Sequence, residues 1–239
     1  MTNRLLSADH PMPSGVNGAS ALPTVNAASR SLVDQVYDQV LARIVRGELP
    51  GGSELKSTVL ADDLGVSRTP VVQALSRLIA DGIVTQRMNM RAVVRPGAEN
   101  WLVEIHELRL LLEPPAAARA AEAMTVEALR DLQTVAEELQ TTSDDAWAER
   151  ARQFDFQLHL TIADHCGNQP LRGAIYKCWQ YKGLSYVLGP DPSEAIQRGL
   201  KEHLSILAAL HARDSRTASA AMELHLRHAA SYRPQKRIV

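Results

Sequence analysis

The apolar residues of segment 32–44 recur at a spacing of four and therefore share one face of a predicted helix. Ser31 is a good N-cap for this helix, which is expected to end near Gly47. A second helix is predicted over 57–64, and a tight turn then leads to Ser67 as the N-cap of a third helix. The apolar stripes consist of Leu32, Val36, Val40 and Ile44 in the first helix and of Val71, Leu75, Leu78 and Ile79 in the third.

Two short β-rich runs follow the third helix. Residues 83–85 and 92–94 are rich in β-branched side chains, and they flank segment 86–91 in the pattern of a short hairpin. Three helices followed by a hairpin predict a winged helix-turn-helix domain over residues 31–96.

The pattern changes after Pro96-Gly97, where Ala-, Leu- and Glu-rich sequence with helical spacing begins. The first helix of this part is expected to be kinked or split at Pro114-Pro115. The expected fold class is therefore mainly α, with an N-terminal winged helix-turn-helix and a C-terminal all-helical antiparallel bundle over 97–232. The predicted helices of the bundle cover about 99–123, 125–141, 144–166, 168–188, 192–212 and 214–232.

The two ends of the chain and its cysteines indicate where in the cell the protein is expected to reside. Residues 1–30 lack apolar periodicity and are expected to form a flexible tail, and 233–239 are expected to form a basic C-terminal tail. No apolar run approaches the roughly 18–20 residues that span a bilayer, and the N-terminus lacks the apolar core of a signal peptide. Cys166 and Cys178 form no CxxC pair, so we expect two buried thiols, no membrane partner and a cytoplasmic location.

The charge is unevenly distributed along the chain. A net charge of −1 over 239 residues by itself argues against a nucleic-acid partner. Segment 67–95, however, holds five arginines and one aspartate, a local net charge of +4 where a recognition helix and wing would meet phosphates. The alternative interpretation is a solvated basic face, which is common in a run this short. Its place after a helix-turn-helix favours DNA binding.

A specific motif, Val66-Ser67-Arg68-Thr69-Pro70-Val71, opens the third predicted helix. With this motif, nearly all of 31–96 resembles the winged-helix domain of the GntR family of bacterial transcriptional regulators. The other matching residues are Val36-Tyr37 through Ile44, Gly47-Glu48-Leu49-Pro50 with Gly52, Leu60-Ala61 through Gly65, Ala74-Leu75, and Leu78 through Val84.

The resemblance implies that Ser67, Arg68 and Thr69 contact DNA. Hydroxyl groups suit phosphate contacts at a helix N-terminus, and arginine can reach a phosphate or a guanine edge. The chain departs from the family at Thr58 and Val72, where arginine is common, and its wing lacks the usual glycines, so its operator preference should differ. Gln73 is a candidate for reading adenine. The predicted DNA-contacting residues are Ser67, Arg68, Thr69, Gln73, Arg77, Arg87 and Arg91.

Asp155 and His159 lie four residues apart, so they project from one face of a predicted helix and can share a ligand. An acid and an imidazole at this spacing more commonly form a surface hydrogen bond, and the pair alone favours that interpretation. His203 and His225 add weight, because they fall at the facing ends of two predicted antiparallel helices. Three histidines and one carboxylate suit zinc, or nickel or manganese.

The bundle resembles the FCD ligand-binding domain of the FadR subfamily within GntR. The matching residues are Glu107 with Arg109, Leu112-Glu113, Asp155 with Leu158-His159, Gly167-Asn168 with Leu171, Glu202-His203, and Met222 through His225. The resemblance implies that Asp155, His159, His203 and His225 are the metal ligands.

Two further residues are candidates for contacting an effector. Arg109 matches a family arginine that can face the ligand cavity, where it would clamp a carboxylate; the alternative is an i,i+4 pair with Glu113. Asn168 matches a family Gly-Asn turn, and helix capping is its simplest role.

The sequence thus predicts a homodimeric transcriptional regulator, expected to be a repressor, that binds double-stranded operator DNA and responds to a small carboxylic acid at a metal site. One alternative is a metal-dependent hydrolase, but the chain lacks an H-E-x-x-H motif, because His106-Glu107 is followed by Leu110 where the second histidine should be. Another alternative is a regulator that responds to the metal alone.

Overall fold

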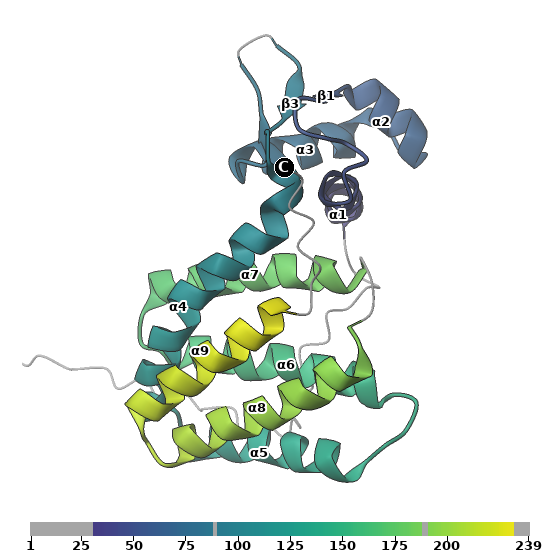
Figure 1. Ribbon diagram of the computed structural model, residues 1–239. Coiled ribbons are helices and arrows are strands. Elements are labelled where there is room, and N and C mark those ends of the chain that lie inside the picture. The colour runs from purple at the N-terminus through teal and green to yellow at the C-terminus, as the bar shows by residue number, and fades with distance from the viewer. Residues whose placement is uncertain (1–30, 88–89, 188–190, 232–239) are drawn as a thin grey trace, which may run out of the picture.

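In the computed structural model, which describes residues 31–87, 90–187 and 191–231, a small N-terminal part sits on a larger helical part (Figure 1). The tails predicted over 1–30 and 233–239 lie outside the described residues. The N-terminal part contains α1 (Leu32–Val45), α2 (Ser57–Leu64), α3 (Arg68–Ala80) and three short strands. The helical part contains a 3₁₀ turn η2 (Ala98–Asn100) and then α4 (Trp101–Ala123), α5 (Val126–Thr141), α6 (Trp147–Asp164), α7 (Gln169–Val187), α8 (Ser193–His211) and α9 (Ser215–Ser231).

Local sequence signals set the bounds of the first three helices. Ser31 and Asp34 form a capping box at the start of α1, in which the Ser31 hydroxyl accepts from the Asp34 amide and the Asp34 carboxylate accepts from the Ser31 amide. Gly47 and Gly65, with φ of 77° and 64°, reverse the chain after α1 and α2. Ser67 takes the extended N-cap conformation before α3, as predicted.

The sheet has one strand more than the sequence predicted. β2 (Val84–Thr85) and β3 (Ala92–Val94) form the expected antiparallel hairpin, but β1 (Glu54–Leu55) pairs with the other edge of β3. The order is therefore β1-β3-β2. A strand of two residues has too few positions to show alternation, so its sequence carried no signal. The sheet ties the wing to the loop before α2.

The helical bundle differs from prediction at two helices. The helix expected to be kinked or split at Pro114-Pro115 is not split. α4 continues through both prolines, with Ala116 and Ala117 completely buried and α4 packed along α9. The helix expected from 144 begins at Trp147 instead, because the Asp144 carboxylate accepts from the Ala146 amide within the preceding turn. Across the described residues, no helix is long and apolar enough to cross a membrane.

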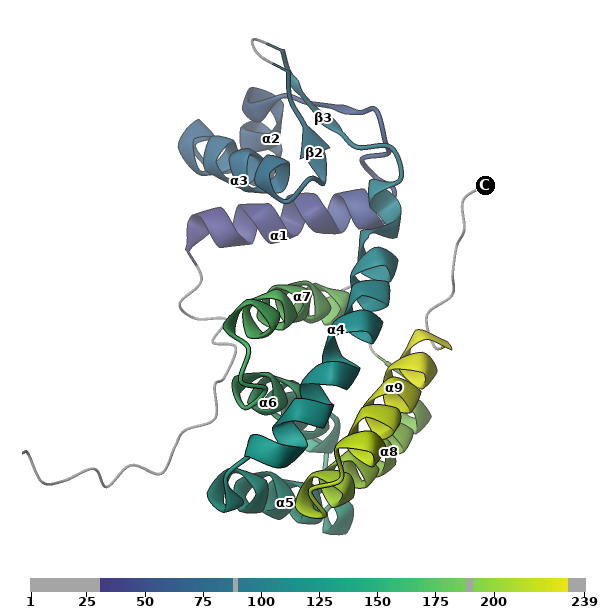
Figure 2. The same ribbon diagram turned by 90° about the vertical axis from the view of Figure 1, so that its left-hand side faces the viewer.

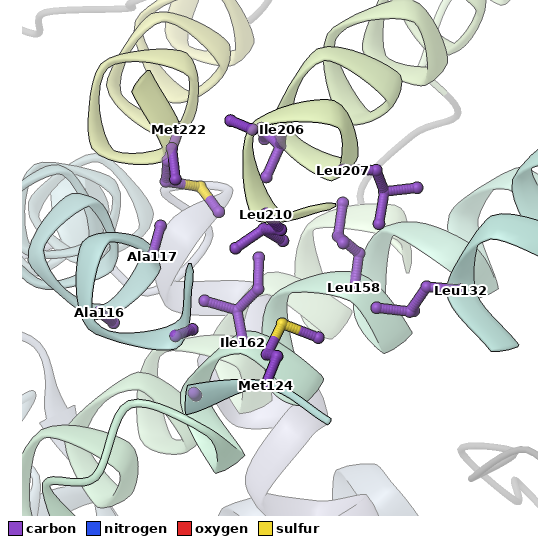
Figure 3. Close-up of a cluster of buried hydrophobic side chains, with 14 of the residues drawn as sticks. Ala116, Ala117, Met124, Leu132, Leu158, Ile162, Ile206, Leu207, Leu210 and Met222 are labelled. Carbon is purple, nitrogen blue, oxygen red and sulfur yellow. The ribbon is translucent and has the colours of Figure 1, made fainter. Parts of the chain in front are cut away.

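The centre of the bundle is an apolar cluster to which α4, α5, α6, α8 and α9 contribute (Figure 3). Both cysteines are buried free thiols, as predicted. The core of the N-terminal part extends into the helical part, because it includes Ile105 of α4 and Cys178, Tyr181 and Leu184 of α7. Figure 2 shows α7 lying directly beneath α1. The two parts therefore share apolar packing through α4 and α7.

Candidate metal centre and nucleic-acid interface

Four side chains from three helices of the bundle converge on one point. Asp155 and His159 lie one turn apart on α6, and they meet His203 of α8 and His225 of α9, with one ligand atom of each within 4.8 Å of the others. Asp155 Oδ1 lies 3.2 Å from His203 Nε2, 3.4 Å from His159 Nε2 and 3.9 Å from His225 Nε2. The Nε2 atoms of His203 and His225 are 3.3 Å apart. The structure thus contains a possible His/Asp metal site.

The geometry of this group fits a metal ion. A tetrahedral zinc ion with bonds of about 2.0–2.2 Å holds its ligand atoms about 3.3–3.6 Å apart, which is close to the spacing seen here. His159 Nε2 is buried and makes no hydrogen bond to any described residue. Such an atom is rare in a folded protein, because burial without a partner costs stability. An ion among the four ligand atoms would satisfy it.

Two glutamates hold the outer nitrogens of the histidines. Glu113 of α4 contacts Nδ1 of His159, and Glu202 of α8 lies 2.9 Å from Nδ1 of His225. A carboxylate at Nδ1 fixes the ring orientation and leaves Nε2 with its lone pair toward the centre, as is usual for metal-binding histidines. Neither role was predictable from the sequence, because Glu113 lies 46 residues from His159 and Glu202 lies 23 from His225, and no local spacing connects either pair.

The ionisation of the site also suits a metal. Burial lowers the pKa of His225 to about 3, and the neighbouring His203 adds to this effect. Burial likewise lowers the pKa of His159, although Glu113 opposes it. Burial alone would raise the pKa of Asp155, but the hydrogen bond with His203 and the nearby His159 hold it well below its ordinary value. At neutral pH, His159 and His225 are therefore neutral and Asp155 is ionised, the forms that bind metals.

A small cavity of about 80 Å³ opens beside the ligands, with Asp155, His203 and His225 in its wall. Arg109 also lines it, and the side chain is only 3% exposed. The two interpretations of Arg109 are therefore compatible, since its Nε donates to Glu113 at 2.5 Å while the side chain lines the cavity. Burial would raise the pKa of Glu113, but the charge of Arg109 and the hydrogen bond with His159 lower it to about 2, so Arg109 and Glu113 are both ionised.

Asn168 lies in a different environment from Arg109. It is exposed before α7, and its side-chain oxygen accepts a hydrogen bond from the Leu171 amide at 3.1 Å, which is a helix cap. It is not among the described residues that line the cavity at the ligands. Its effector-binding role stays a prediction that this placement does not favour.

The start of α3 presents a polar surface in the N-terminal part. Ser67, Arg68, Thr69 and Gln73 are all exposed there, next to one another on the helix. Arg68 Nε donates to the Ser57 hydroxyl of α2 at 3.0 Å, which holds the guanidinium at the helix N-terminus. The structure thus brings four of the seven predicted DNA-contacting residues to one face.

The other three predicted contacts are arginines in different settings. Arg87 is exposed on the wing, and Arg91 forms an ion pair with Glu54 of β1. Arg77 sits in the last turn of α3, where it contacts Asp34 at 2.5 Å and lies over the ring of Tyr37. Because these partners belong to α1, on the side of α3 that faces the bundle, this placement does not favour the predicted DNA contact of Arg77, and we leave it out of the proposed DNA-contacting set. The wing residues Met88 and Asn89 lie outside the described residues.

A winged helix with an exposed basic helix, joined to a helical bundle with a buried His/Asp group, is typical of a DNA-binding regulator. Comparison with known families agrees. Residues 32–94 match the family "Bacterial regulatory proteins, gntR family", and residues 104–228 match the "FCD domain". The chain belongs to the GntR family of bacterial transcriptional regulators, with the FCD domain of its FadR-like subfamily.

Individual relatives support this assignment. The chain is 30% identical over 187 residues to the HTH-type transcriptional regulator McbR of Escherichia coli, covering 77% of this chain and 84% of McbR. It is 28% identical over 211 residues to a probable D-xylose utilization operon transcriptional repressor of Paenarthrobacter nicotinovorans. The match covers 85% of this chain and 88% of that repressor. The solved structure of E. coli McbR/YncC matches with a TM-score of 0.55 at 27% identity, over 84% of this chain and 96% of that one. The family and these relatives are transcription regulators and not enzymes, which sets the hydrolase alternative aside.

Proposed function

We propose that this regulator is a repressor whose hold on its operator depends on a small carboxylic acid bound at a metal ion in the FCD domain. The observation that carries this proposal is the convergence of Asp155, His159, His203 and His225, with His159 Nε2 buried and unbonded among the described residues. These four residues would hold the ion, which supplies an electrophilic position for a ligand oxygen.

The cavity beside the ligands supports a small anionic effector. Its lining holds four cations, Arg109, Arg152, Lys182 and Arg198, against three carboxylates, Asp155, Asp191 and Glu202, and a bound divalent ion would add two further positive charges. A guanidinium or ammonium group near a ligand carboxylate strengthens its binding by charge-assisted hydrogen bonds. The volume of about 80 Å³ limits the effector to a few non-hydrogen atoms in this part of the site. We therefore favour short carboxylic acids over large aromatic ones here.

Helix α7 supports a route from this site to the DNA-binding domain. On one side, Trp179 Nε1 donates to Glu113 at 3.1 Å, and its ring lies 4.7 Å from that of His159, centroid to centroid. On the other side, Lys177 lies 2.9 Å from Asp81, which follows α3. A shift of α7 on effector binding would therefore act on the end of the recognition helix.

The proposed DNA-binding mode follows from the winged helix. We propose that Ser67, Arg68, Thr69 and Gln73 enter the major groove, with Arg87 and Arg91 at the flanking backbone. Two chains would form a homodimer in the cytoplasm that reads two half-sites about one helical turn apart. We also propose the domain limits predicted from the sequence, with the winged helix over 31–96 and the helical domain over 97–232.

The experiment is metal analysis of the purified full-length protein, followed by a thermal-shift screen of short carboxylic acids such as acetate, pyruvate, succinate and citrate. We expect about one divalent ion per chain and a rise in melting temperature with at least one acid, lost on chelation and in Asp155→Ala. Stabilisation that survives both treatments would contradict a metal-bound effector. Metal binding without a response to any acid in melting temperature or DNA binding would favour the regulator that responds to metal alone.

A further inference from the structure

A second and larger cavity lies between the two domains, apart from the metal ligands. It has a volume of about 380 Å³, and its walls come from α1 and α3 of the winged helix and from α6 and α7 of the FCD domain. The volume falls within the range of small-molecule pockets, which often lie at domain interfaces. In Figure 2 this region is the layer where α1 lies over α7, with α6 beneath.

The walls of this interdomain cavity are mainly apolar and aromatic. Tyr37, Phe156, Tyr176, Trp179 and Tyr181 contribute rings, and leucines from α1, α6 and α7 fill the surface between them. The rings meet edge to face, as in the pair Phe156 and Trp179 with centroids 4.6 Å apart. Aromatic walls of this kind favour a flat apolar ligand, which gains contact area on both faces.

The charged groups at this cavity balance one another. Two carboxylates, Asp34 and Asp38, and two cations, Arg77 and Lys177, belong to the lining. Arg77 pairs with Asp34 at 2.5 Å, and Lys177 pairs with Asp81 at 2.9 Å. Because the lining holds as many carboxylates as cations, it offers a charged ligand no net electrostatic attraction. An uncharged ligand needs none, whereas the cavity at the metal ligands would gain positive charge from a bound ion.

Gly183 contributes to the open volume of this cavity because it has no side chain. It lies within α7 and lines the cavity, and a Cβ built at this position would meet only Phe156, at 3.7 Å. Glycine within a helix destabilises the helix relative to alanine. A side chain would fit without a clash and would occupy the cavity, so the glycine leaves the volume open.

We propose that the cavity between α1, α6 and α7 is a second ligand site, which binds an uncharged aromatic molecule. Because its walls belong to both domains, an occupant contacts the DNA-binding domain and the FCD domain at once. Trp179 lines this cavity and also donates to Glu113, which holds His159. The second site therefore shares one side chain with the surroundings of the metal centre.

The test uses 2-naphthol as the probe and calorimetric titration of the full-length protein. We expect binding with a dissociation constant below about 500 µM, as is reasonable for a ligand of this size. Gly183→Met should weaken binding at least tenfold by filling the cavity. The matched control is Gly173→Met in the same helix, where Gly173 is exposed and has nothing within 4 Å of the built Cβ; it should change the dissociation constant less than twofold.

Leu160→Trp on α6 fills the cavity from the opposite wall. It keeps the test decisive if Gly183→Met does not fold. Circular dichroism and melting temperature identify the variants that fold. Asp155→Ala should keep the probe affinity within threefold, because the metal ligands do not line this cavity. The proposal is overturned if wild-type protein shows no binding up to 2 mM, if both folded filling variants bind like wild type, or if Asp155→Ala abolishes binding.

Discussion

The proposed recognition surface and the proposed metal centre are built in opposite ways. Ser67, Arg68 and Thr69 are neighbours in the sequence, exposed, and placed by one helix start. His159 and His203 come from helices far apart in the sequence and are buried at 1% and 4% exposure. Residues of the first kind can change DNA binding with little effect on folding. Residues of the second kind are held by buried charge networks, so function and stability change together.

The largest expected effect is a loss of stability at the buried carboxylate Glu113 beside the metal centre. Glu113→Ala removes the partner of two buried groups, Arg109 and His159, and leaves the guanidinium uncompensated. We expect the free energy of unfolding to fall by about 3–5 kcal/mol, measured by urea denaturation of metal-free protein.

The matched control for Glu113→Ala is Glu223→Ala. Glu223 forms the same kind of i,i+4 pair with Arg227, at 2.6 Å, but both side chains are exposed. Its loss should cost less than about 1 kcal/mol. Equal losses of unfolding free energy in the two variants would show that burial does not make the Arg109–Glu113 pair more important for stability than the exposed pair.

The next effect is on the recognition surface. Arg68→Ala should weaken binding to the promoter of the protein's own gene by about 5–150-fold, since one good arginine contact is worth about 1–3 kcal/mol. Its melting temperature should stay within 2 °C of wild type, because the side chain is exposed. Arg77→Ala in the same helix serves as the control and should change affinity less than threefold. A larger loss in Arg77→Ala than in Arg68→Ala would return Arg77 to the DNA-contacting set.

A smaller effect is expected at the outer carboxylate of the metal centre. Glu202→Gln keeps the shape of the side chain but weakens its hold on Nδ1 of His225, so zinc affinity should fall about 10–100-fold in a competition titration with a chelator. His228 contacts the other oxygen of Glu202, and His228→Ala should change zinc affinity less than threefold. Unchanged affinity in Glu202→Gln would show that the charge of this carboxylate does not support metal binding through His225.

The smallest expected effect is on the pH dependence of stability, and it comes from Asp81 at the contact between the two domains. Tyr37 donates to Asp81 at 2.5 Å, and Lys177 pairs with the same carboxylate. Burial alone would raise the pKa of Asp81, but these partners lower it below its ordinary value of 3.8. The stability from this carboxylate is therefore present above pH 4 and is lost as the pH falls through the lowered pKa.

The corresponding test is Asp81→Asn. Between pH 5 and pH 2.5 its free energy of unfolding should fall less steeply than that of wild type, as followed by urea denaturation at each pH. Asp62→Asn, at an exposed position of α2, is the control and should follow the wild-type curve. Identical curves for wild type and Asp81→Asn would show that the contact between the domains does not depend on this charge.

The same contrast explains what the sequence could reveal. Ser31, Gly47 and Ser67 act within one turn of their own position, so the helix bounds of the winged helix were predictable from local rules. Asp155 and His159 were found because a spacing of four brings them to one helix face. His203 and His225 needed the antiparallel pairing of α8 and α9, which short connections imply.

Other features depend on tertiary packing and had no local signal. Glu113 and Glu202 approach the histidines only after the helices assemble, and the sequence showed Glu113 only as the i,i+4 partner of Arg109. Arg77 has the same residue type as the arginines proposed to contact DNA, but its direction on α3 places it against Asp34 of α1. The cavity between the domains arises from the way α1 lies over α7, which no periodicity encodes.

The most direct test of the account measures DNA affinity by fluorescence anisotropy, at fixed salt, with zinc-loaded protein and the carboxylic acid that most raises its melting temperature. The account predicts that the acid weakens binding to the promoter at least tenfold in wild type. In folded Asp155→Ala the acid should have no effect. An equal response of both proteins to the acid, or no response in wild type, would contradict control of the operator through the metal centre.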